Sequence, residues 1–238
     1  MQAVILAGGK GTRLHPYTKI LPKPLVPIND KAILEIVLIQ LKNAGFKEFI
    51  FTVGHLAEII QAYFRDGKKW GVKISYSIED KPLGTVGPLT LIKNLAPQFL
   101  VMNGDILCNM DYRKFFDQHK RSNNDMTICT YQKKTKIDLG VLEINDGKIV
   151  DYIEKPEYYF SVSMGIYGIN RKIVKNLTKS AYLDFPTLVK EKLEQKARIG
   201  MYHFKGKWYD IGRIEDYQIA QEDFDKHAGE FLRVKKNR

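Results

Sequence analysis

Cysteine is scarce in this chain, whose 238 residues include only Cys108 and Cys129. Both stand in apolar runs and they form no Cys-x-x-Cys pair, which argues against a disulfide framework and against a zinc ribbon. Unpaired, buried thiols are typical of a reducing compartment. We therefore expect a cytoplasmic protein whose stability comes from a hydrophobic core.

Long apolar runs are also missing. No uninterrupted stretch approaches the ~18 residues that a membrane-spanning helix needs. The apolar run at residues 3–7 has no basic residue before it and ends at Gly8 and Gly9, which is not the pattern of a signal peptide. We expect no membrane partner.

Acidic residues are outnumbered, with 27 Asp and Glu against 38 Lys and Arg, a net charge of +11. Such an excess attracts anions, whether nucleic acid, acidic membrane or a phosphorylated small molecule. Part of it lies in the basic segment 233–238, which we expect to be solvated. The rest is scattered, and no Lys/Arg run alternates with aromatic residues, so we expect no nucleic-acid partner. With 44% hydrophobic residues, the chain is not intrinsically disordered.

Strands and helices alternate over about residues 1–124. The expected strands are 3–7, 48–53, 72–77 and 99–103, and the expected helices are 31–44, 56–64, 85–95 and 112–120. Turn residues and hydrophobic periodicity mark these elements. A β-α-β-α order with right-handed crossovers predicts a mostly parallel sheet.

The rhythm changes over about residues 125–238. The expected strands are 126–131, 140–144, 148–153, 163–169 and 198–204, and the expected helices are 185–195 and 214–227. Asn145-Asp146-Gly147 is a strong hairpin turn. No linker or repeat divides the chain, so we expect one domain over residues 1–238. Its predicted class is α/β, a three-layer Rossmann-like fold with a mostly parallel, mixed central sheet.

A glycine-rich loop follows the first strand, at residues 8–14, and a lysine between two prolines, Lys23, comes soon after it. The loop is not a G-x-G-x-x-G fingerprint, because Leu14 stands in the third glycine position, and no Gly-Lys-Ser/Thr occurs for a Walker A loop. Glycines let backbone N–H groups approach an oxyanion. Arg13 adds a planar fork and Lys23 a point charge. A phosphate site is favoured over the alternative, a surface loop with solvated cations.

This loop is the first of a series of motifs. The series is Gly8-Gly9-x-Gly11-Thr12-Arg13-Leu14-x-Pro16-x-Thr18, Lys23-Pro24-x-x-Pro27, Pro82-Leu83-Gly84-Thr85-x-Gly87, Gly104-Asp105, Glu154-Lys155-Pro156, Gly165-Ile166-Tyr167 and Trp208-x-Asp210-Ile211-Gly212. In content and order it resembles the sugar-1-phosphate nucleotidylyltransferases (NDP-sugar pyrophosphorylases). The resemblance covers nearly the whole chain. It implies a nucleotidyltransferase fold, a nucleoside triphosphate and a sugar 1-phosphate as substrates, and Mg²⁺ as cofactor.

The resemblance also implies residue roles. Those implied to bind the nucleotide are Leu6, Ala7, Gly8, Gly9, Gly11, Thr12, Arg13, Lys23, Pro82, Gly84, Thr85, Asn103 and Gly104. The implied catalytic residues are Arg13, Lys23 and Asp105, and the implied metal ligands are Asp105 and Asp210. The implied sugar-phosphate residues are Gly140, Glu154, Lys155, Ser163 and Gly165. A homo-oligomer is left open.

The implied chemistry fits these residue types. A phosphate monoester, with a second pKa of about 6, is already charged at neutral pH and needs no activating base. The task is to bring two polyanions together, which calls for cations and a metal ion. Taken alone, Asp105 could instead cap a turn, and Glu154-Lys155 could be a solvated ion pair. A non-catalytic regulatory homologue would be expected to lack some of these charged residues, and none is missing.

Substrate identity is predicted by likeness only. The run Glu79-x-x-Pro82-Leu83-Gly84-Thr85 is similar to mannose-1-phosphate guanylyltransferases and related heptose and hexosamine enzymes, which favours GTP over CTP, UTP or dTTP. Ser163 stands where family members commonly carry Asn, and Leu139 where they commonly carry an aromatic residue. Both departures lie in the region that the resemblance assigns to the sugar.

Overall fold

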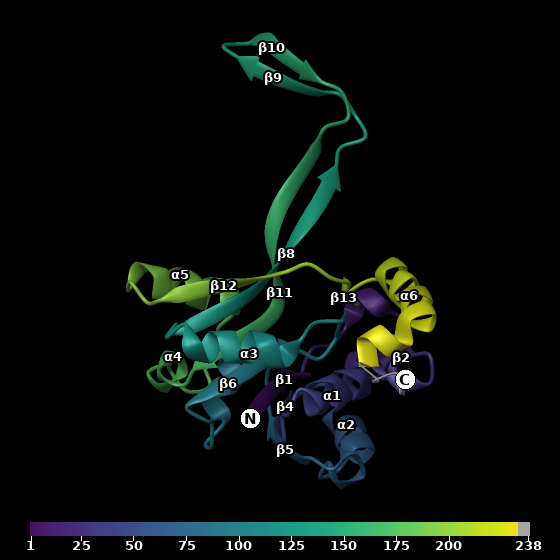
Figure 1. Cartoon of the computed structure of the whole chain (residues 1–238), viewed down its shortest axis with the longest axis vertical. Helices are drawn as coiled ribbons and strands as arrows, with labels where there is room; N and C mark the ends of the chain where they lie inside the picture. The colour runs from purple at the N-terminus through teal and green to yellow at the C-terminus, as the bar shows by residue number, and fades with distance from the viewer. Residues whose placement is uncertain (233–238) are drawn as a thin grey trace.

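The computed structural model describes residues 1–232 (Figure 1); the basic segment 233–238, expected to be solvated, lies outside the described residues. A seven-stranded sheet has the order β12-β8-β11-β6-β1-β4-β5. Its strands are β1 (Gln2–Leu6), β4 (Glu48–Val53), β5 (Lys73–Ile78), β6 (Gln98–Asn103), β8 (Met126–Lys136), β11 (Glu157–Asn170) and β12 (Ile199–Phe204). Strand β11 runs antiparallel to both neighbours, and the other neighbouring pairs in this sheet are parallel. The predicted α/β class with a mostly parallel, mixed sheet is confirmed.

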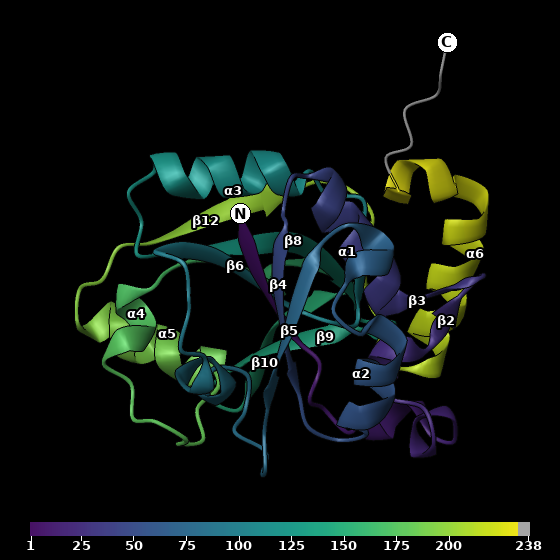
Figure 2. The same ribbon diagram turned by 90° about the horizontal axis from the view of Figure 1, so that it is seen from below.

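Helices cover both faces of the sheet (Figure 2). The helices are α1 (Ile33–Asn43), α2 (Ala57–Phe64), α3 (Tyr112–Arg121), α4 (Lys172–Lys175), α5 (Phe185–Glu194) and α6 (Ile214–Leu232). Successive residues of β1 point to opposite faces, so Ala3 and Ile5 join the core under α1, α2 and α3, whereas Val4 joins the core under α4 and α5. Helix α6 packs on α1 through a third core around Phe224 and Phe231.

Two expected helices differ from the structure. The expected helix 85–95 is wrong: only Gly87–Leu91 is helical, as the short 3₁₀ segment η5. The segment ends early because Ile92 already has extended backbone, and the N–H groups of Val86 and Gly87 tie its start to the carbonyl of Leu183. Helix α1 begins at Ile33, because residues 27–32 form a small hairpin of β2 (Pro27–Ile28) and β3 (Lys31–Ala32).

A long β-arm stands away from the body in Figure 1. Strands β8 and β11 continue pairing as far as Lys136 and Glu157, well beyond the expected ends, and the chain between them forms a hairpin of β9 (Val141–Asn145) and β10 (Lys148–Ile153). A register shift between Ser163 and Tyr167 marks a bulge at the point where β11 leaves the main sheet. Bulges bend a strand and increase its twist. We call residues 132–162 the arm.

A second short pairing was not expected from the sequence. Strand β7 (Ile106–Cys108) pairs antiparallel with β13 (Trp208–Asp210), so that Asp210 lies opposite Ile106. This pairing links the end of β6 to a segment about 100 residues later. Cys108 and Cys129 are both buried, as predicted, and neither forms a disulfide within residues 1–232. Within residues 1–232 no helix combines the length and the apolar character needed to cross a bilayer.

Candidate functional site

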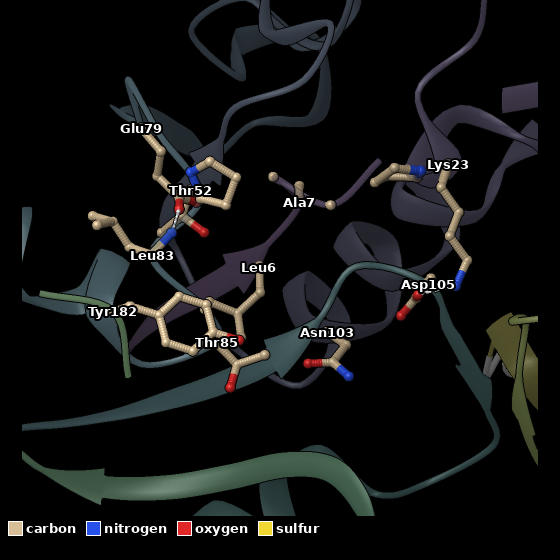
Figure 3. Close-up of a pocket in the computed structure, with 15 residues that line it drawn as sticks. Leu6, Ala7, Lys23, Thr52, Glu79, Leu83, Thr85, Asn103, Asp105 and Tyr182 are labelled. Atoms are coloured by element: carbon tan, nitrogen blue, oxygen red, sulfur yellow. Dashed lines mark hydrogen bonds and ion pairs between the residues drawn. The ribbon is translucent and has the colours of Figure 1, made fainter. Parts of the chain in front are cut away.

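A cleft of about 350 Å³ opens where β1, β4 and β6 end (Figure 3). Loops at the carboxyl ends of parallel strands are the usual binding position in open α/β sheets. The cleft is lined by ten of the residues that the sequence analysis assigned to nucleotide binding or catalysis: Leu6, Ala7, Gly8, Gly9, Lys23, Pro82, Gly84, Thr85, Asn103 and Asp105. In Figure 3, Lys23 and Asp105 lie at one end and Glu79, Leu83 and Tyr182 at the other.

Lys23 and Asp105 form an ion pair at the first end of the cleft. Lys23 belongs to the 3₁₀ segment η3 (Lys23–Leu25) and Asp105 follows β6. The side chain of Lys23 is only 10% exposed, and a cation held this far from water requires a charged partner. The Lys23 ammonium meets one carboxylate oxygen of Asp105, while the other, Oδ1, is buried and has no hydrogen-bond partner among residues 1–232.

Asp210 lies beside this pair. The β7–β13 pairing carries it there, because Ile211 donates its N–H to the carbonyl of Asp105 at 3.2 Å. Burial raises the pKa of the Asp210 carboxyl, the negative charge of Asp105 raises it further, and the cations Lys23 and Arg13 act against both. These mutual effects show that two carboxylates and two cations share one small region.

Arg13 reaches the same region from the glycine-rich loop. It lies in η1 (Thr12–Leu14), and its guanidinium packs on Gly212, where an added Cβ would lie 3.2–3.3 Å from guanidinium atoms. Gly11 has φ +62° and an added Cβ would come within 3.0 Å of the Cβ of Lys23. A side chain at position 11 would therefore push Lys23 away from Asp105.

Not every residue of the loop faces the cleft. Thr12 and Arg13 are exposed, and neither they nor Gly11 belong to its lining. Gly104 also lies behind the lining, where its N–H donates to the carbonyl of Leu6 at 2.9 Å and ties the end of β6 to β1.

The carboxylate pair suits a divalent cation. Asp105 offers an oxygen that has no hydrogen-bond partner in the described part of the chain, and Asp210 stands close enough for its pKa to respond to Asp105. Mg²⁺ prefers oxygen ligands and keeps several waters, so two carboxylates and substrate oxygens can complete its coordination. Residues 1–232 contain no group of three or more His, Cys, Asp or Glu side chains arranged to hold a metal by themselves. The donor set therefore fits a cation held jointly by protein and substrate.

The opposite end of the cleft is held by a contact that the sequence analysis missed. Asp184, which precedes α5, accepts hydrogen bonds from the N–H of Thr85 at 2.9 Å and from its hydroxyl at 3.2 Å. Tyr182, part of the cleft lining, donates to Asp184 at 2.6 Å. Gly84 has φ +78° and lies against the carbonyl of Leu183. Because partners are about 100 residues apart, no local pattern in the sequence could have indicated them.

Glu79 also faces this end of the cleft and had no assigned role. Its Oε2 accepts the N–H of Leu83 at 3.1 Å, and burial raises the pKa of its carboxyl, with the Leu83 hydrogen bond acting in the opposite direction. Glu79 lies next to Gly8, where an added Cβ would meet Oε1 at 2.6 Å. A half-buried carboxylate thus lies at the end of the cleft opposite Lys23.

The residues expected to hold the sugar phosphate are divided between two places. Gly165 has φ +72° and packs on Asn103 of the cleft, where an added Cβ would lie 2.7 Å from its side-chain nitrogen. Ser163, two residues before it, has its hydroxyl 3.2 Å from that of Tyr167. Both lie at the root of the arm.

The other three lie out on the arm. Tyr152 packs over Gly140 and donates its hydroxyl proton to Glu154 at 3.1 Å. Lys155 is exposed, and its Nζ lies 3.8 Å from a carboxylate oxygen of Glu154. The structure therefore gathers Gly140, Glu154 and Lys155 near one another but not into the cleft of the same chain.

Comparison with known proteins agrees with this architecture. A family model described as nucleotidyl transferase matches residues 2–227. The UTP–glucose-1-phosphate uridylyltransferase of Synechocystis sp. is 34% identical over 92% of this chain and 62% of its own length. A mannose-1-phosphate guanyltransferase of Yarrowia lipolytica is 33% identical, over 91% of this chain and 62% of its own length. The chain thus spans about 62% of the length of these curated relatives.

Solved structures match over the whole body. HddC from Yersinia pseudotuberculosis is similar with a TM-score of 0.73 and 28% identity, covering 94% of this chain and 99% of that one. A putative glucose-1-phosphate thymidylyltransferase from Bacillus anthracis, at 24% identity and a TM-score of 0.73 over 93% of this chain and 94% of its own, shares the fold. Since the family model extends through nearly all of the described residues, this chain belongs to the nucleotidyl transferase family, as the order of its motifs predicted.

Proposed function

We propose that this chain, as one nucleotidyltransferase domain, transfers a nucleotidyl group from a nucleoside triphosphate, preferentially GTP, to a sugar 1-phosphate. The products are an NDP-sugar and pyrophosphate. The observation that carries the proposal is the buried Lys23–Asp105 pair beside a glycine loop, in which one Asp105 oxygen has no hydrogen-bond partner among residues 1–232. A carboxylate arranged in this way has no structural hydrogen bond to explain that oxygen, whereas a cation bound with the substrate would use it.

The chain's own groups support an in-line displacement at the α-phosphorus. The sugar phosphate is an adequate nucleophile without a general base, which agrees with a cleft lining that includes no histidine among the described residues. In this proposal Lys23 and Arg13 hold the phosphates that leave as pyrophosphate, where negative charge grows. Asp105 and Asp210 would hold Mg²⁺, which when bound would offset the negative charge of the phosphates.

The backbone of the loop positions the nucleotide. Gly8 and Gly9 line the cleft, and their lack of a side chain lets peptide N–H groups come within hydrogen-bond distance of phosphate oxygens. On the far side, Gly84 and Thr85 are fixed by Asp184 and by the carbonyl of Leu183. Pre-set loops on both sides reduce the entropy lost when the triphosphate is aligned.

The preference for GTP rests on Glu79. The Watson–Crick edge of guanine carries two adjacent N–H donors, and a carboxylate accepts both, whereas uracil and thymine carry one. Glu79 is the acidic side chain in the lining at the end away from Lys23. The relatives' names include both guanyl- and uridylyltransferases, so the choice of base needs its own experiment. Glu79→Gln is expected to lower the rate with GTP at least tenfold and to reduce the difference between the rate with GTP and the rates with UTP and dTTP.

We propose that a sugar 1-phosphate of mannose, heptose or hexosamine type is bound by Ser163 and Gly165 at the root of the arm and by Gly140, Glu154 and Lys155 on the arm. Lys155 supplies the cation that a second phosphate requires, because the described residues that line the cleft include one lysine and no arginine. Two polyanions facing one paired lysine would otherwise repel each other.

The test is pyrophosphate release from the purified chain over a grid of GTP, UTP, dTTP and CTP against sugar 1-phosphates, with Mg²⁺ present. The expected result is turnover with at least one pair, fastest with GTP, and loss of turnover in Asp105→Asn. Asp111→Asn serves as the matched control, because Asp111 caps α3 at the exposed side of the protein and its loss is expected to leave the rate unchanged. Nucleotide binding without turnover for every pair would favour a regulatory homologue instead.

A further inference from the structure

The arm exposes an unusual amount of apolar surface. Of the large hydrophobic side chains exposed among residues 1–232, more than half belong to residues 137–160: Ile137, Leu139, Leu142, Ile144, Ile149, Val150, Tyr152, Ile153, Tyr158, Tyr159 and Phe160. Neither the arm nor its hairpin joins any of the three hydrophobic cores. An isolated two-stranded hairpin is marginally stable in water, and a contiguous apolar patch of several hundred Å² marks an interface.

The arm also carries a site fragment away from the cleft. Lys155 stands eight residues before Ser163, which lies at the root, and Glu157–Ser163 pair in register with β8. At about 3.3 Å per residue, this ladder holds Lys155 roughly 25 Å along the strand from Ser163. Ser163 already adjoins the cleft through Gly165 and Asn103. Lys155 cannot reach the cleft of its own chain unless most of the β8–β11 arm ladder breaks.

We propose that the arm reaches the cleft of a second copy of this chain, and that two copies exchange arms in a symmetric dimer in which Lys155 and Glu154 complete the partner's sugar-phosphate site. This inference rests on the proposed function for the role of Lys155, but not for the dimer itself. A two-fold dimer buries the same patch on both copies, so each arm completes the site of the other copy.

The exposed apolar area and the charge of the arm suit a second copy of this chain as its partner. In Tyr152, Tyr158, Tyr159 and Phe160 about half of each ring is exposed, with exposed fractions of 37–61%. At 150–250 Å² per buried aromatic side chain, these four offer on the order of 400 Å² per arm and twice that for two arms. With the aliphatic residues added, the total approaches the 1,200–2,000 Å² of a standard interface.

The charge of the arm also permits docking on a second basic chain. Five lysines and six carboxylates make residues 132–162 nearly neutral, although the whole chain carries +11. A nearly neutral arm is not repelled by a strongly basic body. Around the receiving cleft, Tyr182 is 67% exposed and Ile20, three residues before Lys23, is 80% exposed, so apolar partners are available there.

The first test is the mass of the full chain in solution at micromolar concentration, by light scattering after gel filtration. The expected mass is twice 27.5 kDa. In a shortened variant, an Asn-Gly turn replaces residues 138–155; because none of these belongs to a hydrophobic core, the body is expected to keep its circular dichroism spectrum and to become monomeric. A monomeric full chain, or a shortened variant that remains dimeric, would overturn the proposal whatever the enzyme activity.

The second test is complementation between Asp105→Asn and Lys155→Ala, refolded together in equal amounts. With exchanged arms, half of the dimers are mixed and one of their two sites is intact, so about a quarter of the wild-type rate is expected to return. With arms that serve their own chain, no activity returns. Failure of Lys155→Ala to lower the rate at all would instead count against the proposed role of Lys155, and the mass measurement would still decide the exchange.

A second mixture distinguishes exchange of arms from stabilisation of one variant by the other. Wild type refolded with an equal amount of the double variant Asp105→Asn/Lys155→Ala forms mixed dimers in which neither site is intact. Exchange predicts that the rate per wild-type chain falls to about half, whereas arms serving their own chain predict no change. An unchanged rate in this mixture would overturn the exchange.

Discussion

Gly84 is a sensitive test of how the nucleotide end of the cleft is built. It has φ +78°, and a Cβ added there would lie 2.6 Å from the carbonyl oxygen of Leu183 and 2.7 Å from Oδ1 of Asp184. Gly84→Ala therefore combines a left-handed conformation, which costs about 1–2 kcal/mol for a residue with a Cβ, with a steric clash. Relief of the clash displaces Leu183, whose carbonyl accepts N–H bonds from Val86 and Gly87.

The magnitude follows from these two parts. Losing two backbone hydrogen bonds costs about 2 kcal/mol, so the free energy of unfolding is expected to fall by about 3–4 kcal/mol in total. Gly71→Ala is the matched control: Gly71 has φ +68°, but an added Cβ would meet only the end of the Lys42 side chain at 3.9 Å. It is expected to cost only the conformational part, which lowers Tm by about 2–8 °C.

The decisive assay is calorimetric titration of GTP, below the Tm of both variants. Gly84→Ala is expected to weaken GTP binding at least tenfold, because the loop that carries Thr85 must move, while Gly71→Ala binds like wild type. If both variants bound GTP with the wild-type Kd, the loop at residues 82–87 would not be part of the nucleotide site, and the reasoning from its geometry would be refuted.

Three further predictions concern other groups. Arg13→Ala is expected to lower kcat by at least tenfold because charge grows on the leaving pyrophosphate; a raised KM with unchanged kcat in steady-state assays would show that Arg13 acts only in substrate binding. Asp184→Ala, which removes the anchor of Thr85, is expected to raise KM for GTP at least fivefold, whereas Tyr182→Phe, which removes only the hydroxyl, is expected to stay within twofold; equal effects would contradict the anchor. Burial lowers the pKa of His119 to about 4 from 6.5, and Lys120 adds to the effect. As the pH falls, the unfolded chain therefore binds this proton before the folded chain does, and about 3 kcal/mol of stability is lost between pH 6.5 and 4. In urea unfolding, the free energy of His119→Gln is expected to fall less over that range, and parallel pH curves for the two proteins would contradict this assignment.

The body of the fold could be predicted because its strands are buried on both faces. Residues 48–53 and 99–103 are nearly continuous apolar runs, which mark strands covered by helices on each side. Within the arm, the hairpin at residues 141–153 was predicted from its turn, but the extension of β8 gave no such signal. Residues 132–136, Gln-Lys-Lys-Thr-Lys, are polar on both faces, and they are strand only because β11 pairs with them. Hydrophobic periodicity reports burial, and a ladder exposed on both faces has none to report.

The site divides in a similar way. Glycines 8 and 9 and Lys23 could be predicted because their loop follows the first strand, whereas the role of Asp105 was implied by the order of motifs. Asp184 could not, because its contact with Thr85 spans 99 residues and depends on how α5 meets the loop. The order of motifs placed Lys155 in the site, whereas the backbone places it on the arm. Sequence order does not tell whether Lys155 serves the cleft of its own chain or, as we propose, that of a second copy.

The central claim is direct nucleotidyl transfer at the Lys23–Asp105 end of the cleft. It is tested by incubating the chain with Mg²⁺, a sugar 1-phosphate and GTP radiolabelled either at the α- or at the γ-phosphorus. The account predicts that α-label appears in the NDP-sugar and γ-label in pyrophosphate, and that Asp105→Asn produces neither. Release of γ-label as inorganic phosphate, or an Asp105→Asn variant that forms NDP-sugar at the wild-type rate, would contradict it.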